Sequence, residues 1–258
     1  MKILQQSIVS LAAKGMRLDG RKLDQIRDIV IEASPIEKAE GSAIVKLGRT
    51  KVIAGVKIGV GQPFSDRPGS GVLMTGAEFS PISSPDFEPG PPRDNSIELA
   101  RVVDRGIRES QAIDLDKLCI EPGEKVWMVF VDINILDNFG NLIDAAALAS
   151  AVALSRAVFP KYEDGAVIFT EKTKKKLPVA CLPIACTSFK VGERLLLDAT
   201  REEEEAAGAR ITVTTRDDGN VAAIQKGGEE GITPAEIEHA LDMAVEKGKE
   251  IRKLVKQA

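Results

Sequence analysis

The sequence is poorest in the residue that most self-contained active sites need. It contains one histidine, His239, in 258 residues. Histidine is the usual general base near neutral pH and the commonest metal ligand. With a single copy, a histidine-based catalytic triad or zinc site within one chain is nearly excluded.

Cysteines and long apolar segments are also scarce. Cys119, Cys181 and Cys186 are odd in number and form no CxxC pair, which is typical of small buried side chains in a reducing compartment. No apolar run approaches the ~20 residues of a membrane span, and residues 2–14 carry no signal-peptide cleavage site. We therefore expect a cytoplasmic protein with no membrane segment.

Aromatic residues and positive charge are both limited. Aromatics make up 4% of the sequence, and the net formal charge is −4. A platform for stacked bases is therefore poorly supported, and the basic excess of an autonomous nucleic-acid binder is missing. Any contact with nucleic acid must come from a local cluster of cations, shared with a partner.

The hydrophobic patterns that are present indicate an α+β fold in two units. In each unit strands come first and helices after, so we expect one domain over 1–160, with an N-terminal helix, and a smaller one over 161–258. The main strands and helices expected in the first unit are 42–47, 51–56, 72–79, 96–112, 125–136 and 142–159. Those of the second are 166–170, 180–190, 194–198, 209–215, 220–225 and a last helix opened by the capping box Thr233-Pro234-Ala235-Glu236.

The helix expected over 96–112 carries the most informative pattern. Arg101, Arg105 and Arg108 share an arc of about 60° on one side of it. Three permanent cations with planar donor forks can bind successive phosphates. Spacing alone, however, favours a solvated face or ion pairs with nearby acids. The acids within reach are Glu98, Asp104 and Glu109.

A group of acids surrounds the next strand-to-helix turn. Asp132, Asp137 and Asp144 are candidates to hold Mg²⁺ and cleave phosphodiesters. Aspartate also caps turns and favours the first turn of a helix, and this second interpretation is the preferred one. A lysine run is expected in an exposed loop that single-stranded RNA can touch with little specificity. Its members are Lys172, Lys174, Lys175 and Lys176.

Several segments together resemble proteins of the RNase PH family. The start of such proteins is matched by 17–22 (RLDGRK), 41–43 (GSA) and 48–52 (GRTKV). One branch of the family, the non-catalytic subunit of the archaeal exosome ring, is matched by 87–92 (FEPGPP), 97–105 (IELARVVDR), 120–123 (IEPG) and 126–127 (VW). The resemblance covers nearly the whole chain and is clearest from 17 to 150.

The resemblance implies a fold, an assembly and an activity for the complex. The fold is that of RNase PH, a ribosomal S5 domain 2-like β-α unit followed by a second, smaller one. Three copies would alternate with three catalytic subunits in a hexameric ring that carries RNA-binding cap proteins. The complex would degrade single-stranded RNA by phosphorolytic 3′→5′ exoribonuclease activity, with inorganic phosphate and Mg²⁺ as groups of the partner's site.

Three departures from the catalytic relatives accompany this resemblance. Their paired arginine is replaced by 94–95 (DN), their phosphate-binding turn by 140–144 (GNLID), and the segment of their catalytic aspartate by 207–210 (AGAR). Without these groups the transferring phosphoryl has no electrostatic stabilisation. We therefore expect no catalytic residue, no metal ligand and no cofactor in this chain.

The resemblance reverses the interpretation of the arginines. It implies that Arg101 and Arg105 reach across the subunit interface to RNA phosphates beside the partner's active site. Arg108 is expected as a third RNA-binding residue or as an ion-pair partner at the interface. Two alternatives remain: an active phosphorolytic or metal-dependent RNase that uses the three acids, and a purely structural ring spacer.

Overall fold

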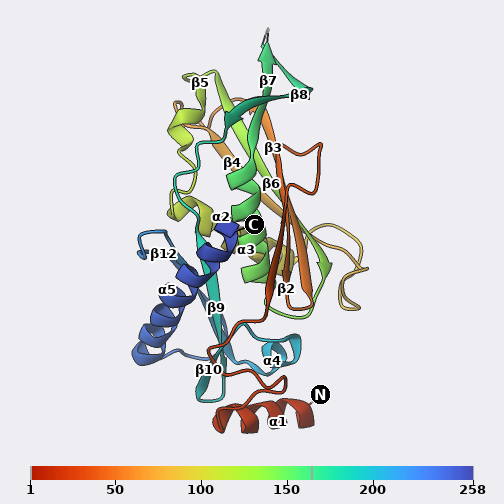
Figure 1. Cartoon of the computed structure of the whole chain (residues 1–258), viewed down its shortest axis with the longest axis vertical. Coiled ribbons are helices and arrows are strands. Elements are labelled where there is room, and N and C mark those ends of the chain that lie inside the picture. The colour runs from red at the N-terminus through yellow and green to blue at the C-terminus, as the bar shows by residue number, and fades with distance from the viewer. Residues whose placement is uncertain (1, 164, 258) are drawn as a thin grey trace.

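The computed structural model describes residues 2–163 and 165–257, and it confirms an α+β fold. A large sheet has the strand order β1-β2-β3-β6-β4, with β5 on β6, and a second sheet has the order β10-β9-β11-β12 (Figure 1). The first sheet contains β1 (Ile29–Ala33), β2 (Gly41–Leu47), β3 (Thr50–Gly61), β4 (Val72–Phe79), β5 (Cys119–Glu121) and β6 (Lys125–Asp137). The second contains β9 (Ile184–Val191), β10 (Arg194–Leu197), β11 (Ala209–Thr215) and β12 (Val221–Gly228).

The helices lie between and beside these sheets. They are α1 (Lys2–Ala13), α2 (Asp94–Glu109), α3 (Leu142–Arg156), α4 (Arg201–Ala206) and α5 (Pro234–Gln257), with a short 3-10 turn, η1, over Leu115–Leu118. Helix α3 packs against β2 and β3 of the first sheet and against β9 of the second (Figure 1). It therefore joins the two sheets through one shared core.

The composition of α3 explains this central position. Nine of its residues are buried, and most of them are alanines. Small side chains on all sides allow sheets and helices to approach closely. Gly41 of β2 shows how close the approach is, since a Cβ atom there would lie 2.2 Å from the Ala153 carbonyl oxygen.

Helix α2 is amphipathic in the way the sequence predicts. Its buried side includes Leu99, Val103 and Ile107, which pack against β4 and α3. The helix connects β4 to β6, and these two strands run parallel. The arginines on the opposite side are thereby held at the edge of a rigid core.

The N-terminal segment packs against residues of the second sheet and α4 that are far away in the sequence. Helix α1 buries Ile8 against Val191 and Leu196. Arg17, 5% exposed, forms an ion pair of 2.5 Å with Glu203 of α4 and donates to the Leu197 carbonyl oxygen at 2.9 Å. Glu203 also completes a capping box with Thr200, which explains why the acidic run there is helical.

The structure corrects the sequence prediction in the segment between the two sheets. The helix expected to end at 159 ends at Arg156, because the chain turns at once into β7 (Val158–Glu163). This strand pairs with β8 (Ala166–Lys176) in a hairpin that projects from one end of the molecule (Figure 1). The lysine run expected in a loop, from Lys172 to Lys176, lies on β8. Residue 160, the predicted domain boundary, lies within β7, and the boundary itself stays a prediction.

The last helix begins where its capping box predicts. The Thr233 hydroxyl accepts a hydrogen bond from the Glu236 amide at 3.3 Å, and the Glu236 carboxylate accepts one from the Thr233 amide at 2.6 Å. Its buried face ends with Val255, while Leu254, expected on that face, is 42% exposed. Among the described residues, no helix is long and apolar enough to cross a membrane.

Candidate functional site

The arginine side of α2 faces away from the core. Arg101, Arg105 and Arg108 are all exposed. Together with residues of β4 and β12, they line an open cavity of about 840 Å³. The structure therefore brings the three predicted residues together on one surface, which we call the arginine face.

Arg101 and Arg105 keep their positive charge available on this face. In the described part of the chain, Arg101 has no hydrogen-bond or ion-pair partner. Arg105 donates from Nη1 to Oε1 of Gln225 on β12 at 2.7 Å. A neutral amide orients the guanidinium without cancelling its charge, so both residues can still pair with an anion.

Arg108 is engaged differently. Its Nε and Nη2 donate to the two carboxylate oxygens of Asp104, each at 3.0 Å, and Nη2 also donates to the Leu73 carbonyl oxygen at 3.0 Å. Thr75 of β4 donates to Asp104 at 3.1 Å. Arg108 is thus an ion-pair partner within its own chain, which limits the charge it can offer to a ligand.

The acids considered for Mg²⁺ binding lie in different environments. Asp132 is exposed on β6, and partial desolvation of its carboxyl, together with the charge of Glu78, raises its pKa. Asp144 is turned into the interior, where its carboxylate accepts from the Thr187 amide at 2.9 Å and hydroxyl at 2.7 Å. Asp137 is exposed at the end of β6. Within residues 2–163 and 165–257, no group of three potential ligands is arranged to hold a metal ion.

The three segments that depart from the catalytic pattern lie close together in the fold. One residue of each lines a cavity of about 260 Å³, namely Asn95, Leu142 and Arg210. Arg210 is held in an ion pair with Glu98 of α2 at 2.5 Å. We call this second cavity the closed cavity; the name refers to its cation, which is already paired, and not to its access, which is open to solvent.

The Glu204 side chain lies at the N-terminus of α3, beside the closed cavity. The backbone amide of Asn141 donates a hydrogen bond to Oε1 of Glu204 at 2.7 Å. A helix N-terminus favours a negative charge, and a carboxylate of α4 supplies it here. Burial nevertheless raises the pKa of Glu204 to about 7, so the group titrates near neutral pH.

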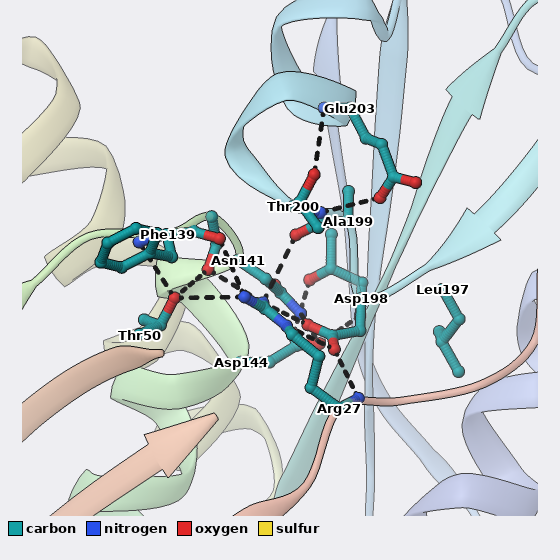
Figure 2. Close-up of polar contacts among 12 residues, drawn as sticks. Arg27, Thr50, Phe139, Asn141, Asp144, Leu197, Asp198, Ala199, Thr200 and Glu203 are labelled. Carbon is teal, nitrogen blue, oxygen red and sulfur yellow. Dashed lines mark hydrogen bonds and ion pairs between the residues drawn. The ribbon is translucent and has the colours of Figure 1, made fainter. Parts of the chain in front are cut away.

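Asn141 is itself fixed by a buried polar network (Figure 2). Its backbone is left-handed, with φ 54°, and its side-chain amide donates to Asp144 at 2.8 Å and to Asp198 at 2.9 Å. Arg27 closes the network with an ion pair of 2.6 Å to Asp198. Burial opposes the ionisation of Asp198, but the hydrogen bonds and charge of Arg27 outweigh it and lower the pKa of this carboxyl.

Burial also dominates the ionisation of Asp144. Desolvation raises the pKa of Asp144 to about 6, although hydrogen bonds from Thr187 and Asn141 oppose the shift. Asp144 lies in the first turn of α3, where the preferred interpretation puts it, and its hydrogen bonds link Asn141 to Thr187 of the second sheet. Asp132, Asp137 and Asp144 do not form a common site.

Two residues that matter here were missed by the sequence analysis. Gln225 carries no sequence signal, because its partner Arg105 is 120 positions away. Glu204 belongs to the acidic run 202–205, but nothing in that run distinguishes it from its exposed neighbours Glu202 and Glu205. Only the folded chain shows that Glu204 faces the N-terminus of α3.

Comparison with family models gives two matches to this chain. Residues 25–160 match the family model of the 3′ exoribonuclease family, domain 1, and residues 181–247 match domain 2 of that family. An exosome complex component Rrp42 of Methanocella arvoryzae is 47% identical over 251 residues, covering 97% of this chain and 95% of that protein. Rrp42 of Thermoplasma acidophilum is 48% identical over 251 residues, with coverage of 97% and 94%.

Solved structures agree with the sequence relatives. A chain of the Archaeoglobus fulgidus exosome with RNA bound to the active site is 47% identical, with a TM-score of 0.91 and coverage of 98% and 97%. Rice Rrp46 shares the fold at 17% identity, with a TM-score of 0.70 and coverage of 93% and 98%. The shared architecture and the two matched domains show that this chain belongs to the RNase PH family of 3′ exoribonucleases.

Proposed function

We propose that this chain is a non-catalytic ring subunit of an archaeal exosome that binds RNA phosphates next to a partner's active site. The observation that carries the proposal is the contrast in available charge. Arg101 and Arg105 are exposed on the arginine face without an acidic partner among the described residues. Arg210, in the closed cavity, is paired with Glu98.

The binding mode follows from the chemistry of the arginine face. A guanidinium binds phosphate with a planar fork and reads no base edge, so binding is independent of sequence. The net charge of −4 makes autonomous binding weak, and a neighbouring subunit must complete the surface. The relatives named as exosome components, and the solved exosome that contains RNA, support this assembly.

The proposed partner is a catalytic RNase PH-like subunit in a three-plus-three ring, with RNA-binding cap proteins above it. Phosphorolysis then belongs to the partner, together with its inorganic phosphate and Mg²⁺. In this chain the closed cavity presents Asn95, Leu142 and the paired Arg210. These groups leave the transferring phosphoryl without an available cation.

The decisive experiment measures RNA decay with inorganic phosphate present. We expect no nucleoside diphosphate from this chain alone, and rapid release once the catalytic-type partner is added. Release by this chain alone would overturn the non-catalytic assignment and favour an enzyme built on its own carboxylates.

A second experiment separates RNA binding from a purely structural role. Arg101→Glu and Arg105→Glu should weaken RNA binding by the assembled ring and reduce its salt dependence. If both variants assemble and bind RNA with unchanged affinity and salt slope, the arginines do not contact RNA. If both fail to assemble, with no selective loss of RNA, the ring-spacer alternative is favoured.

A further inference from the structure

Two arginines of the arginine face have fixed partners, and the partners differ in charge. Arg108 is bound by the carboxylate of Asp104, whereas Arg105 is bound by the amide oxygen of Gln225. From this difference we infer that Gln225 is a positioning residue, which aims the Arg105 guanidinium at an RNA phosphate while leaving its charge intact. This inference rests on the proposed function.

The chemistry of the pair suits this role. A guanidinium has five N–H donors, and the contact with Gln225 uses Nη1 at 2.7 Å. The other donors remain for a phosphate, which an arginine binds best with two parallel hydrogen bonds. A carboxylate at position 225 would hold the side chain equally well but would compete with the phosphate for its charge.

The support for Gln225 comes from the second sheet. Gln225 is half-buried on β12, where it lies opposite Thr212 of β11. The neighbouring strand also approaches α2 closely, since a Cβ atom at Gly106 would lie 3.1 Å from the Thr214 hydroxyl. The separation between α2 and this sheet is therefore set by close packing.

The consequence is a loss of freedom for Arg105 before any ligand arrives. A long exposed arginine has many rotamers, and fixing one of them lowers the entropic cost of binding. Arg101, which has no such partner among the described residues, must be ordered by the RNA itself. The two arginines should therefore respond differently to changes at position 225.

The test measures binding of a single-stranded RNA oligonucleotide to the assembled ring, without inorganic phosphate so that the RNA stays intact. Gln225→Ala should weaken binding about threefold, the scale of one hydrogen bond. Gln225→Glu should weaken it about tenfold and lower the salt slope by about 0.7, as if one phosphate contact were lost. Gln62→Glu, at an exposed position that does not line this cavity, is the matched charge control and should bind as the wild type does.

A double-mutant cycle assigns the effect to Arg105. In an Arg105→Ala background, Gln225→Ala should have no further effect on RNA affinity. An equal effect of Gln225→Ala in both backgrounds, or equal affinities of Gln225→Glu and Gln62→Glu, overturns the positioning role. If Arg105→Ala alone leaves RNA affinity unchanged, the proposed RNA contact of Arg105 fails instead. Ring assembly is checked by mass for every variant, and the cycle with alanine decides if Gln225→Glu does not assemble.

Discussion

The arginine face and the closed cavity lie on different sides of α2 and use their charges in opposite ways. On the arginine face, Arg105 has a neutral partner and Arg101 has none among the described residues, while Arg108 is paired with Asp104 of the same helix. In and around the closed cavity, Arg210 meets Glu98, and the N-terminus of α3 meets Glu204. The comparison teaches that a site loses its affinity for an external anion when the protein supplies the anion itself.

The largest expected effect on stability is at the network of Arg27 and Asp198, which holds Asn141 at the start of α3. Asp198→Asn leaves Arg27 buried without its counter-charge and should lower the free energy of unfolding by about 3 kcal/mol. Urea denaturation of the purified chain measures the change. Asp19→Asn removes a partly exposed partner of Arg21 and should cost less than about 1 kcal/mol. Equal losses in the two variants would contradict the role of burial.

The next largest effect is the change in the free energy of unfolding with pH that the titration of Glu204 causes. Burial raises the pKa of Glu204 in the folded chain to about 7, above its ordinary value of 4.5. The stability contributed by its protonated form is therefore fully present below pH 4.5 and is lost as pH rises through 7. Glu204→Gln should therefore be more stable than the wild type at pH 8, by on the order of 2 kcal/mol, and equal to it near pH 4. Asp144, with a pKa raised to about 6, contributes in the same direction and remains in both proteins.

Glu202→Gln is the control for this titration, since Glu202 is exposed on the same helix. Its unfolding midpoint should follow the wild type between pH 4 and pH 8. A Glu204→Gln variant whose stability keeps the pH dependence of the wild type would show that Glu204 is not the group that titrates.

The third effect is on RNA affinity and comes from comparing Arg101 with Arg108 on the arginine face. Arg101→Gln should weaken RNA binding by the ring about fivefold and reduce the salt slope by about 0.7, because one phosphate contact is lost. Arg108→Gln should change affinity less than twofold, since its charge is already satisfied by Asp104 at 3.0 Å. Anisotropy titrations at several salt concentrations measure both, and the reverse order of the two effects would reject the assignment.

The smallest effect is expected at the ion pair of Arg210 and Glu98, of which Glu98 lines both cavities. Arg210→Gln breaks a pair whose side chains are 28% and 43% exposed, so it should cost less than about 1 kcal/mol. The same variant should release no nucleoside diphosphate from RNA in the presence of phosphate, because the closed cavity gains no available cation. A gain of phosphorolysis would show that this pair alone had suppressed the activity.

Local patterns were sufficient to predict much of the fold. Strand β4 has the predicted bounds, 72–79, and the capping box at Thr233 predicts the start of α5. The arginine stripe was also predictable, because helical periodicity alone places Arg101, Arg105 and Arg108 on one face. These features depend only on residues that lie close to one another in the sequence.

The remaining features depend on partners far away in the sequence. Strand β7 contains Pro160, which normally interrupts a strand, but its pairing with β8 shifts in register around that residue. Helix α4 has six residues, too few to be stable alone, and it is held by Arg17 from 186 positions earlier. The partners of Arg105 and Asn141 likewise come from the second sheet and α4, beyond the reach of local patterns.

The long-range pair of Arg17 and Glu203 has a consequence for synthesis of the chain on the ribosome. The strands and helices between residues 29 and 156 can pack as soon as they emerge, since their main contacts are with one another. Helix α1 emerges before these elements, yet its apolar side packs against Val191 and Leu196, and Arg17 pairs with Glu203. Helix α1 therefore packs later than the elements that follow it, and its apolar side stays exposed until Val191, Leu196 and Glu203 have emerged.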